Sequence, residues 1–317
     1  MDLHLIKELA LAIFLGLVQG ITEFLPISST AHLRLASEFL VGKDIGLSAS
    51  NIIQAGTLVA IIQYFWSDLK SLYYHIVKVL TNKLELAQCW HNICSWWQGK
   101  TDFQDESEAD LDILIAQVVL ATLPIVAFAL LMRQPVEWLR ENILYIALFL
   151  VAGGILITLS ELVHKARLSL PKTVKMAPWE VLVIGCCQCL SVFPGISRSG
   201  ATLSGALFLG RERQTSVRFS FLLSIPALGL AGIYDLVKVV KEFLTSKQIF
   251  LWPNAQTWSL DYIHLSLVSL IVGFVVAYFV GLLCLRWLLK YLATNNAWVF
   301  VIYRLILASV IVAMVYF

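Results

Sequence analysis

Charged residues are scarce in this chain: only 14% of its 317 residues are Asp, Glu, Lys or Arg, and 59% are hydrophobic. A soluble domain carries about 25% charged residues. The composition therefore excludes a soluble globular protein and predicts a polytopic membrane protein. The net charge of +2, with no clustered basic tail, excludes nucleic acid as a partner.

Cysteines with the spacing of a metal site are also missing. Cys186, Cys187 and Cys189 lie in an apolar segment without a nearby histidine, so we expect them to pack as small hydrophobic side chains. Cys89 and Cys94 lie in a loop that the topology below assigns to the cytoplasmic side, where disulfides are rare. The six cysteines thus predict neither a metal centre nor a disulfide.

Long apolar runs are abundant, and six reach the length of about 20 residues that a spanning helix needs. They fall near residues 49–66, 111–132, 143–163, 216–237, 264–285 and 298–317. Two further apolar regions, 9–41 and 179–210, are broken at Pro26 and at Pro194. Proline removes a helix donor and disfavours helix at the preceding residue. We interpret both regions as re-entrant helix pairs; one long discontinuous span in each is the alternative.

The two broken regions repeat one motif. Gly16, Gln19, Phe24, Ile27 and Ser28 recur 169 positions later as Gly185, Gln188, Phe193, Ile196 and Ser197. If each half holds a re-entrant pair and three spanning helices, the second half lies upside down, because three is odd. We therefore predict an all-α polytopic membrane protein with six transmembrane helices and two re-entrant helix pairs in an inverted-topology repeat. The repeats are residues 1–165 and 175–317, and such repeats put the ligand site where the broken helices meet.

The loop charges predict the orientation. Lys and Arg number thirteen on one predicted side and eight on the other, and the richer side is expected to be cytoplasmic. Both termini and the first hairpin then face outward. The loop 67–110, with apolar residues at helical spacing from Leu72 to Leu80, predicts an interfacial amphipathic helix followed by a solvated acidic run at 102–112.

The first polar motif, residues 19–32, suggests both a cation site and an anion site. Gln19 and Glu23 stand one turn apart on a helix, which suits a hard cation held by a carboxylate and a neutral oxygen. Ser28 and Ser29 fall where a new helix begins, and its free N–H groups attract anions. His32 follows as a candidate acid or base, close enough along a helix to assist Ser29 as a nucleophile. The alternative is that Glu23 only fixes packing.

The second motif, residues 193–202, repeats the device with Arg198, whose planar fork suits phosphate. The alternative is that Arg198 pairs with Glu23 for structure alone. Two helix N-termini, an arginine and a divalent cation together describe a site for a doubly phosphorylated headgroup, with a lipid tail among the apolar helices. The candidate diphosphate ligands are Ser28, Thr30, Ser197, Ser199, Gly200 and Thr202.

With these motifs the chain resembles the undecaprenyl-diphosphatase family, the integral-membrane lipid-diphosphate phosphatases linked to bacitracin resistance. The family pattern matches at residues 19–32 and 194–202, and the likeness continues through 53–56, 220–226 and 302–304. The resemblance implies hydrolysis of undecaprenyl diphosphate to undecaprenyl phosphate, dependent on Mg²⁺ or Ca²⁺. It implies an active-site core of Glu23, Ser29, His32 and Arg198, with Gln19 and Glu23 holding the metal. Gln19 replaces the acid found in many family members.

The resemblance also implies a place in the cell: the bacterial inner membrane, where the recycled carrier lipid serves cell-wall synthesis. The expected partners are a polyprenyl diphosphate, the bilayer and a second copy of the chain. A transporter or flippase for a phosphorylated lipid or another anion is the main rival, because inverted repeats around broken helices are a transporter design. The lipid phosphatases with a histidine nucleophile are excluded, since no His or Asp follows Arg198 at the required spacing.

Overall fold

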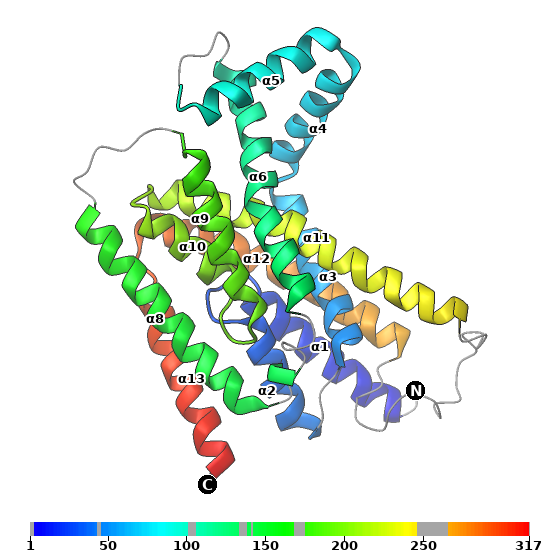
Figure 1. Cartoon of the computed structure of the whole chain (residues 1–317). Helices are drawn as coiled ribbons and strands as arrows, with labels where there is room; N and C mark the ends of the chain where they lie inside the picture. The colour runs from blue at the N-terminus through cyan, green and yellow to red at the C-terminus, as the bar shows by residue number, and fades with distance from the viewer. Residues whose placement is uncertain are drawn as a thin grey trace.

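Helices make up all the regular structure of the described part of the chain. The computed structural model describes residues 3–42, 46–100, 106–132, 138–140, 142–167, 175–245 and 266–316. Its elements, labelled in Figure 1, are α1 Leu3–Thr22, α2 Ser29–Val41, α3 Gly46–Tyr64, α4 Trp66–Thr81, α5 Lys83–Trp97, α6 Glu106–Leu131, α8 Ile143–Arg167, α9 Pro178–Cys189, the short 3₁₀ helix η1 Leu190–Val192, α10 Arg198–Phe208, α11 Arg213–Thr245, α12 Leu267–Thr294 and α13 Trp298–Tyr316. The predicted all-α fold class is confirmed.

Six of the described helices are long and apolar enough to cross a membrane: α1, α6, α8, α11, α12 and α13. Five of these match predicted spans. The predicted span at 49–66 corresponds to α3, which meets the criterion only together with α4, from which it is bent by 74°. Helix α1 meets it alone, although we predicted it as one arm of a re-entrant pair. The chain is a multi-pass membrane protein, and the re-entrant course of α1–α2 and α9–α10 stays a prediction.

Both predicted breaks are present in the structure. Helix α1 ends at Thr22 and α2 begins at Ser29; η1 ends at Val192 and α10 begins at Arg198. In each case the two helices flanking the break pack against each other. Proline at 26 and 194 cannot supply the N–H that would continue the helix. The polar motifs therefore lie on turns and on the first turns of new helices, as the sequence indicates.

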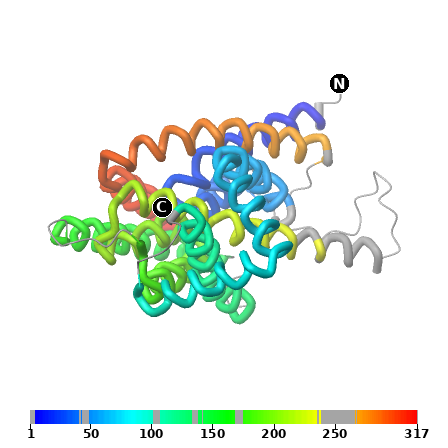
Figure 2. The backbone as a smooth tube through the Cα atoms, turned by 90° about the horizontal axis from the view of Figure 1, so that it is seen from above, coloured from blue at the N-terminus to red at the C-terminus, as the bar shows by residue number. Residues whose placement is uncertain are grey.

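The helices of the two halves pair in a reciprocal way. Helix α1 packs on α12, and its counterpart α9 packs on α6; α3 also packs on α12, and α11 on α6. Figure 2 shows α12, in orange, running beside α1, in blue, at one edge of the bundle. Helix α12 of the second half thus packs against helices of the first half, and α6 of the first half packs against helices of the second. Two interlocked repeats would produce this pairing, but the repeats, their boundaries 1–165 and 175–317 and the inverted orientation stay predictions.

Aromatic residues bury the two turns at corresponding positions. Phe24 is 2% exposed and packs edge-on against Phe221, with ring centroids 5.8 Å apart. Its counterpart Phe193 stacks on Phe149 at 5.1 Å. Burying a phenylalanine contributes about 1.5–3 kcal/mol. Phe24 therefore anchors the first turn in the apolar core, and the half-buried Phe193 packs the second turn against α8.

Helices α4 and α5 form a hairpin that projects from the bundle (Figure 1). It is fastened to α6 by Asp112, whose carboxylate contacts Nε2 of His75 at 2.7 Å and accepts from Nδ2 of Asn92 at 2.8 Å. Burial and a hydrogen bond to Asp112 raise the pKa of Cys89 to about 12.

Asp112 is 2% exposed, so our prediction of a solvated acidic run is wrong at this residue, which packs against the hairpin instead. The interfacial location of the hairpin stays a prediction.

Candidate active site

The carboxylate of Glu23 joins the two motifs. Its Oε1 accepts a hydrogen bond from Nη2 of Arg198 at 2.6 Å, and its Oε2 accepts from Oγ of Ser29 at 2.7 Å. The Glu23 side chain is only 3% exposed and that of Arg198 is 18% exposed. Residues 175 positions apart in the chain therefore meet at one buried ion pair. Three of the four predicted core residues are in direct contact.

Two further side chains, one from α1 and one from α3, donate hydrogen bonds to Glu23. Nε2 of Gln19 donates to Oε2 of Glu23 at 2.8 Å, and Nε2 of Gln54 lies 3.2 Å from Oε1. The hydroxyl of Thr57 accepts from Gln19 at 3.5 Å. We did not predict Gln54 or Thr57 as site residues. Two signals could have found them: Gln54 lies in the stretch 53–56 that carries the family likeness, and both are polar residues inside an otherwise apolar run.

Ser28 and Ser197 cap the two helices that begin at the site. Oγ of Ser28 accepts from the N–H of Ala31, and Oγ of Ser197 accepts from the N–H of Gly200, each at 3.4 Å. Both serines have φ of 74°, a left-handed conformation that is uncommon outside glycine. The caps orient the first turns of α2 and α10, and a capping side chain stabilises a helix by about 1 kcal/mol.

The other predicted diphosphate ligands lie on the first turns of α2 and α10. Thr202 is buried and donates to the carbonyl oxygen of Arg198 at 2.9 Å. Ser199 lies 3.1 Å from Oγ of Ser197 and is half-buried, as is Thr30. The N–H of Gly200 already bonds to Ser197. Of these residues, Ser199 and Thr30 present the more accessible hydroxyls, and phosphate binding by the set stays a prediction.

His32 lies beside the site but faces different partners. Its Nδ1 is 2.7 Å from the carbonyl oxygen of Ser28, and its Nε2 is 2.7 Å from Oη of Tyr303. A carbonyl only accepts, so Nδ1 carries the proton and Nε2 accepts from Tyr303. The expected proton transfer from Ser29 to His32 is therefore wrong for this structure. The hydroxyl of Ser29 donates to Glu23, and Nδ1 of His32 donates to the backbone carbonyl of Ser28.

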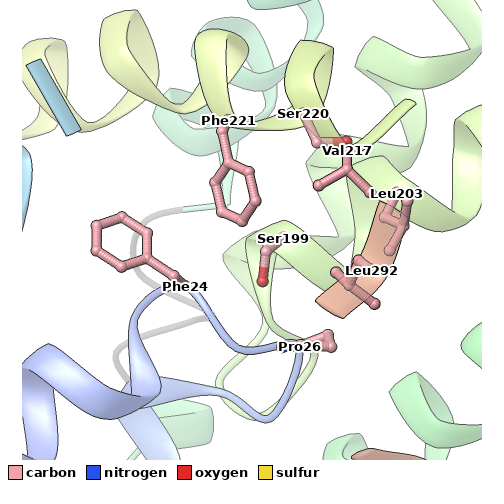
Figure 3. Close-up of a pocket in the computed structure, with 8 residues that line it drawn as sticks. All are labelled: Phe24, Pro26, Ser199, Leu203, Val217, Ser220, Phe221 and Leu292. Atoms are coloured by element: carbon pink, nitrogen blue, oxygen red, sulfur yellow. The ribbon is translucent and has the colours of Figure 1, made fainter. Parts of the chain in front are cut away.

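A small pocket, with little more than the room for one water molecule, lies between the turns and helix α11. Figure 3 shows the hydroxyl of Ser199 directed toward a space bounded by the rings of Phe24 and Phe221. The remaining lining residues are Pro26, Leu203, Val217, Ser220 and Leu292. The lining is thus mostly apolar, with two serines, and Ser199 is the one that belongs to the second motif.

The donors around Glu23 suit a hard cation. Carboxylate, amide and hydroxyl oxygens are what Mg²⁺ and Ca²⁺ prefer, and Mg²⁺ is usually held by one or two carboxylates together with substrate phosphates. Within the described ranges no group of three or more His, Cys, Asp or Glu could hold a metal, so Glu23 is the carboxylate available. Arg198 competes with a cation for Oε1. The residues therefore fit a cation that binds with a diphosphate, rather than a closed protein site.

Comparison with known proteins gives the same picture. The family model described as bacitracin resistance protein BacA matches residues 12–310. A protein of Prosthecochloris aestuarii named undecaprenyl-diphosphatase is 35% identical over 308 residues, covering 96% of each chain. Proteins with that name from Chlorobium phaeovibrioides and Nocardia farcinica are 36% and 33% identical, covering at least 93% of each chain. Matches over nearly the whole length show that this chain belongs to the BacA bacitracin-resistance family.

Proposed function

We propose that this protein is a hydrolase that converts undecaprenyl diphosphate into undecaprenyl phosphate and inorganic phosphate. The relatives carry the name of this activity over almost the full length of the chain. The observation that carries the proposal is Glu23, which holds the Ser29 hydroxyl on one oxygen and the Arg198 guanidinium on the other. A base, a nucleophile and a phosphate ligand are what phosphoryl transfer requires. The reaction recycles the carrier lipid for cell-wall synthesis and confers bacitracin resistance.

Ser29 is the proposed nucleophile. Its Oγ attacks the terminal phosphorus while Glu23 takes the hydroxyl proton, and the bond from that phosphorus to the bridging oxygen breaks. Undecaprenyl phosphate leaves with the bridging oxygen and its electron pair. Water then displaces Tyr303 from Nε2 of His32 and attacks the phosphoserine, Nε2 accepts a proton from that water, and the proton on Glu23 returns to Oγ of Ser29. Direct attack by water, with Ser29 only holding a phosphate oxygen, is the alternative that the labelling experiment in the Discussion tests.

Arg198 and the two helix starts bind the phosphates in this proposal. The guanidinium donates to phosphate oxygens in two parallel bonds and stabilises the charge that develops during transfer. The first turns of α2 and α10 add N–H groups and the positive ends of two helix dipoles. Thr30 and Ser199 supply hydroxyls from the same turns.

The proposed cofactor is Mg²⁺ or Ca²⁺, held by Glu23 and Gln19. A bound cation neutralises charge on the phosphate oxygens. Glu23 is paired with Arg198 in the structure; with a cation at Glu23, the Arg198 guanidinium would be available to the phosphate oxygens. The apolar side chains beside Ser199 would then face the first part of the polyprenyl chain.

The proposed location is the bacterial inner membrane, with both termini on the extracytoplasmic side, in keeping with the excess of Lys and Arg on the other side. A homodimer is the proposed assembly.

Phosphate release tests the proposal. Purified protein in detergent with Mg²⁺ or Ca²⁺ is expected to release inorganic phosphate from a polyprenyl diphosphate, and Glu23→Ala is expected to abolish the release. Excess chelator should also abolish it, and undiminished turnover in chelator would overturn the metal role alone. A transporter or flippase would move the lipid and release no phosphate.

A further inference from the structure

Arg304 lies at the crossing of the two broken helices, although no step of the proposed reaction uses it. Its side chain, on α13, is 0% exposed. Nη1 donates to the carbonyl oxygen of Pro26 at 2.9 Å and to that of Ile196 at 3.0 Å, while Nη2 donates to that of Gly195 at 2.7 Å. Pro26 and Gly195 are corresponding positions of the two motifs. One guanidinium thus binds the backbone of both turns.

The same side chain is fixed to helix α8. Nε donates to the carbonyl oxygen of Leu150 at 3.0 Å, and Nη2 donates to that of Phe149 at 3.3 Å. All five N–H groups of the guanidinium therefore bond to backbone carbonyls, and none is left for a carboxylate. Buried backbone carbonyls need hydrogen-bond partners, so Arg304 satisfies groups that the helix breaks would otherwise leave unpaired.

Space for this guanidinium depends on Gly153. A Cβ added at Gly153 would overlap Nη2 of Arg304, whereas one added at the adjacent Gly154 would meet only Val301, at an ordinary 3.9 Å. The two glycines are neighbours on one helix, and only one of them faces the clamp. They therefore form a matched pair for testing it.

We propose that Arg304 is a positioning residue that locks the two motif turns together, so that α2 and α10 present Ser29 and Arg198 to the same carboxylate. This inference rests on the proposed function for its catalytic consequence, but not for the clamp itself. Lysine cannot replace the side chain, because a single ammonium has three donors at one point and cannot reach five carbonyls.

The test compares Arg304→Lys and Gly153→Ala with Gly154→Ala in lipid nanodiscs. Hydrogen exchange is measured at segments 22–31 and 192–201. We expect faster exchange in both segments together in Arg304→Lys and Gly153→Ala, and no change in Gly154→Ala. Unchanged exchange in the first two variants, or a change confined to one motif, would overturn the clamp. If Arg304→Lys fails to fold, Gly153→Ala, which keeps the arginine, decides the outcome by the same readout.

Kinetics of phosphate release give the second readout. The clamp variants should lose at least about tenfold in kcat with KM changed less than about threefold, because a 1 Å misplacement far from the chemistry can cost about 10²-fold. When Arg304→Lys or Gly153→Ala is combined with Arg198→Lys, the loss in kcat should be smaller than the product of the two single losses. Both substitutions disturb the same alignment of Arg198 with Glu23, so their effects are coupled. Full additivity, or unchanged kcat with faster exchange, would refute positioning. Absence of phosphate release by the wild type would refute the proposed function and leave the exchange result to judge the clamp.

Discussion

Nη2 of Arg198 lies 2.6 Å from Oε1 of Glu23, and this ion pair connects the second motif to the first. Removing one member of a buried pair leaves an uncompensated charge, which destabilises by about 3–5 kcal/mol. Without substrate the carboxylate therefore neutralises the guanidinium. A diphosphate offers a competing set of anionic oxygens, so the pair is suited to opening when the headgroup binds.

Arg198→Lys is expected to lower the rate of phosphate release by roughly 10²-fold or more, the order typical for removing one transition-state donor. Lysine keeps the charge beside Glu23 but cannot donate two parallel bonds to phosphate. The measurement is the initial rate of phosphate release at saturating lipid, with thermal unfolding followed in parallel.

Arg213→Lys is the matched control for Arg198→Lys. Arg213 also pairs with a glutamate, away from the motif turns: its Nη1 and Nη2 donate to Glu161 at 2.8 and 2.5 Å, whereas Arg198 donates one bond to Glu23. Its replacement should affect stability and leave the rate within about threefold, as expected where no transition-state contact is lost. Near-normal turnover in folded Arg198→Ala would show that Arg198 is structural.

Covalent labelling distinguishes the two forms of the reaction. If Ser29 attacks phosphorus, quenching turnover of a labelled diphosphate should trap phosphoserine in the wild type and none in Ser29→Ala. Because Glu23 accepts a hydrogen bond from the Ser29 hydroxyl in the structure and is its proposed base, Glu23→Gln should also prevent trapping. His32→Asn should still form the phosphoserine and release it slowly, since Nδ1 of His32 bonds only to the Ser28 backbone.

Persistence of a few per cent of activity in Ser29→Ala, with no covalent species in any variant, would contradict serine attack. Water would then be the nucleophile, and Ser29 would position a phosphate oxygen.

Gln19 and Gln188 occupy corresponding positions of the repeat, yet their environments differ. Gln19 donates to Glu23, whereas neither polar side-chain atom of the buried Gln188 has a hydrogen-bond partner among the described residues. A buried unpaired amide costs about 1–3 kcal/mol. Gln188→Met is therefore expected to keep the rate and to raise the unfolding temperature.

Gln19→Met, made in parallel, should lower phosphate release by about tenfold or more, because a hydrogen bond to a charged group contributes about 1.5–3 kcal/mol. Equal effects of the two substitutions on rate would show that Glu23 does not depend on Gln19. A fall in the unfolding temperature of Gln188→Met would show that its amide is paired in the membrane.

The sequence was sufficient to predict the helix breaks and most of the spans, and it singled out the residues that meet at Glu23, whose roles stay predictions. A proline or a polar residue inside an apolar run is a local signal, because its effect on the helix does not depend on which distant segments pack against it. Gln54, Tyr303 and Arg304 were missed as site residues because each comes from a helix remote in the chain, and only packing brings it to the turns. The Ser29–His32 pairing failed for a local reason: helical spacing brings the two side chains near each other, but it does not show that the Ser28 carbonyl takes Nδ1.

The last prediction concerns orientation, which decides from which side the headgroup reaches Glu23. In a variant without the native cysteines, single cysteines in the loops 67–110 and 164–178 should react with a membrane-impermeant maleimide only after the cytoplasmic face is exposed. A tag after Phe317 should be accessible from outside. The excess of Lys and Arg in those loops is the physical reason, because positively charged loops are retained in the cytoplasm. Labelling of both loops in intact cells would invert the protein and move the access route of the first motif to the cytoplasmic leaflet.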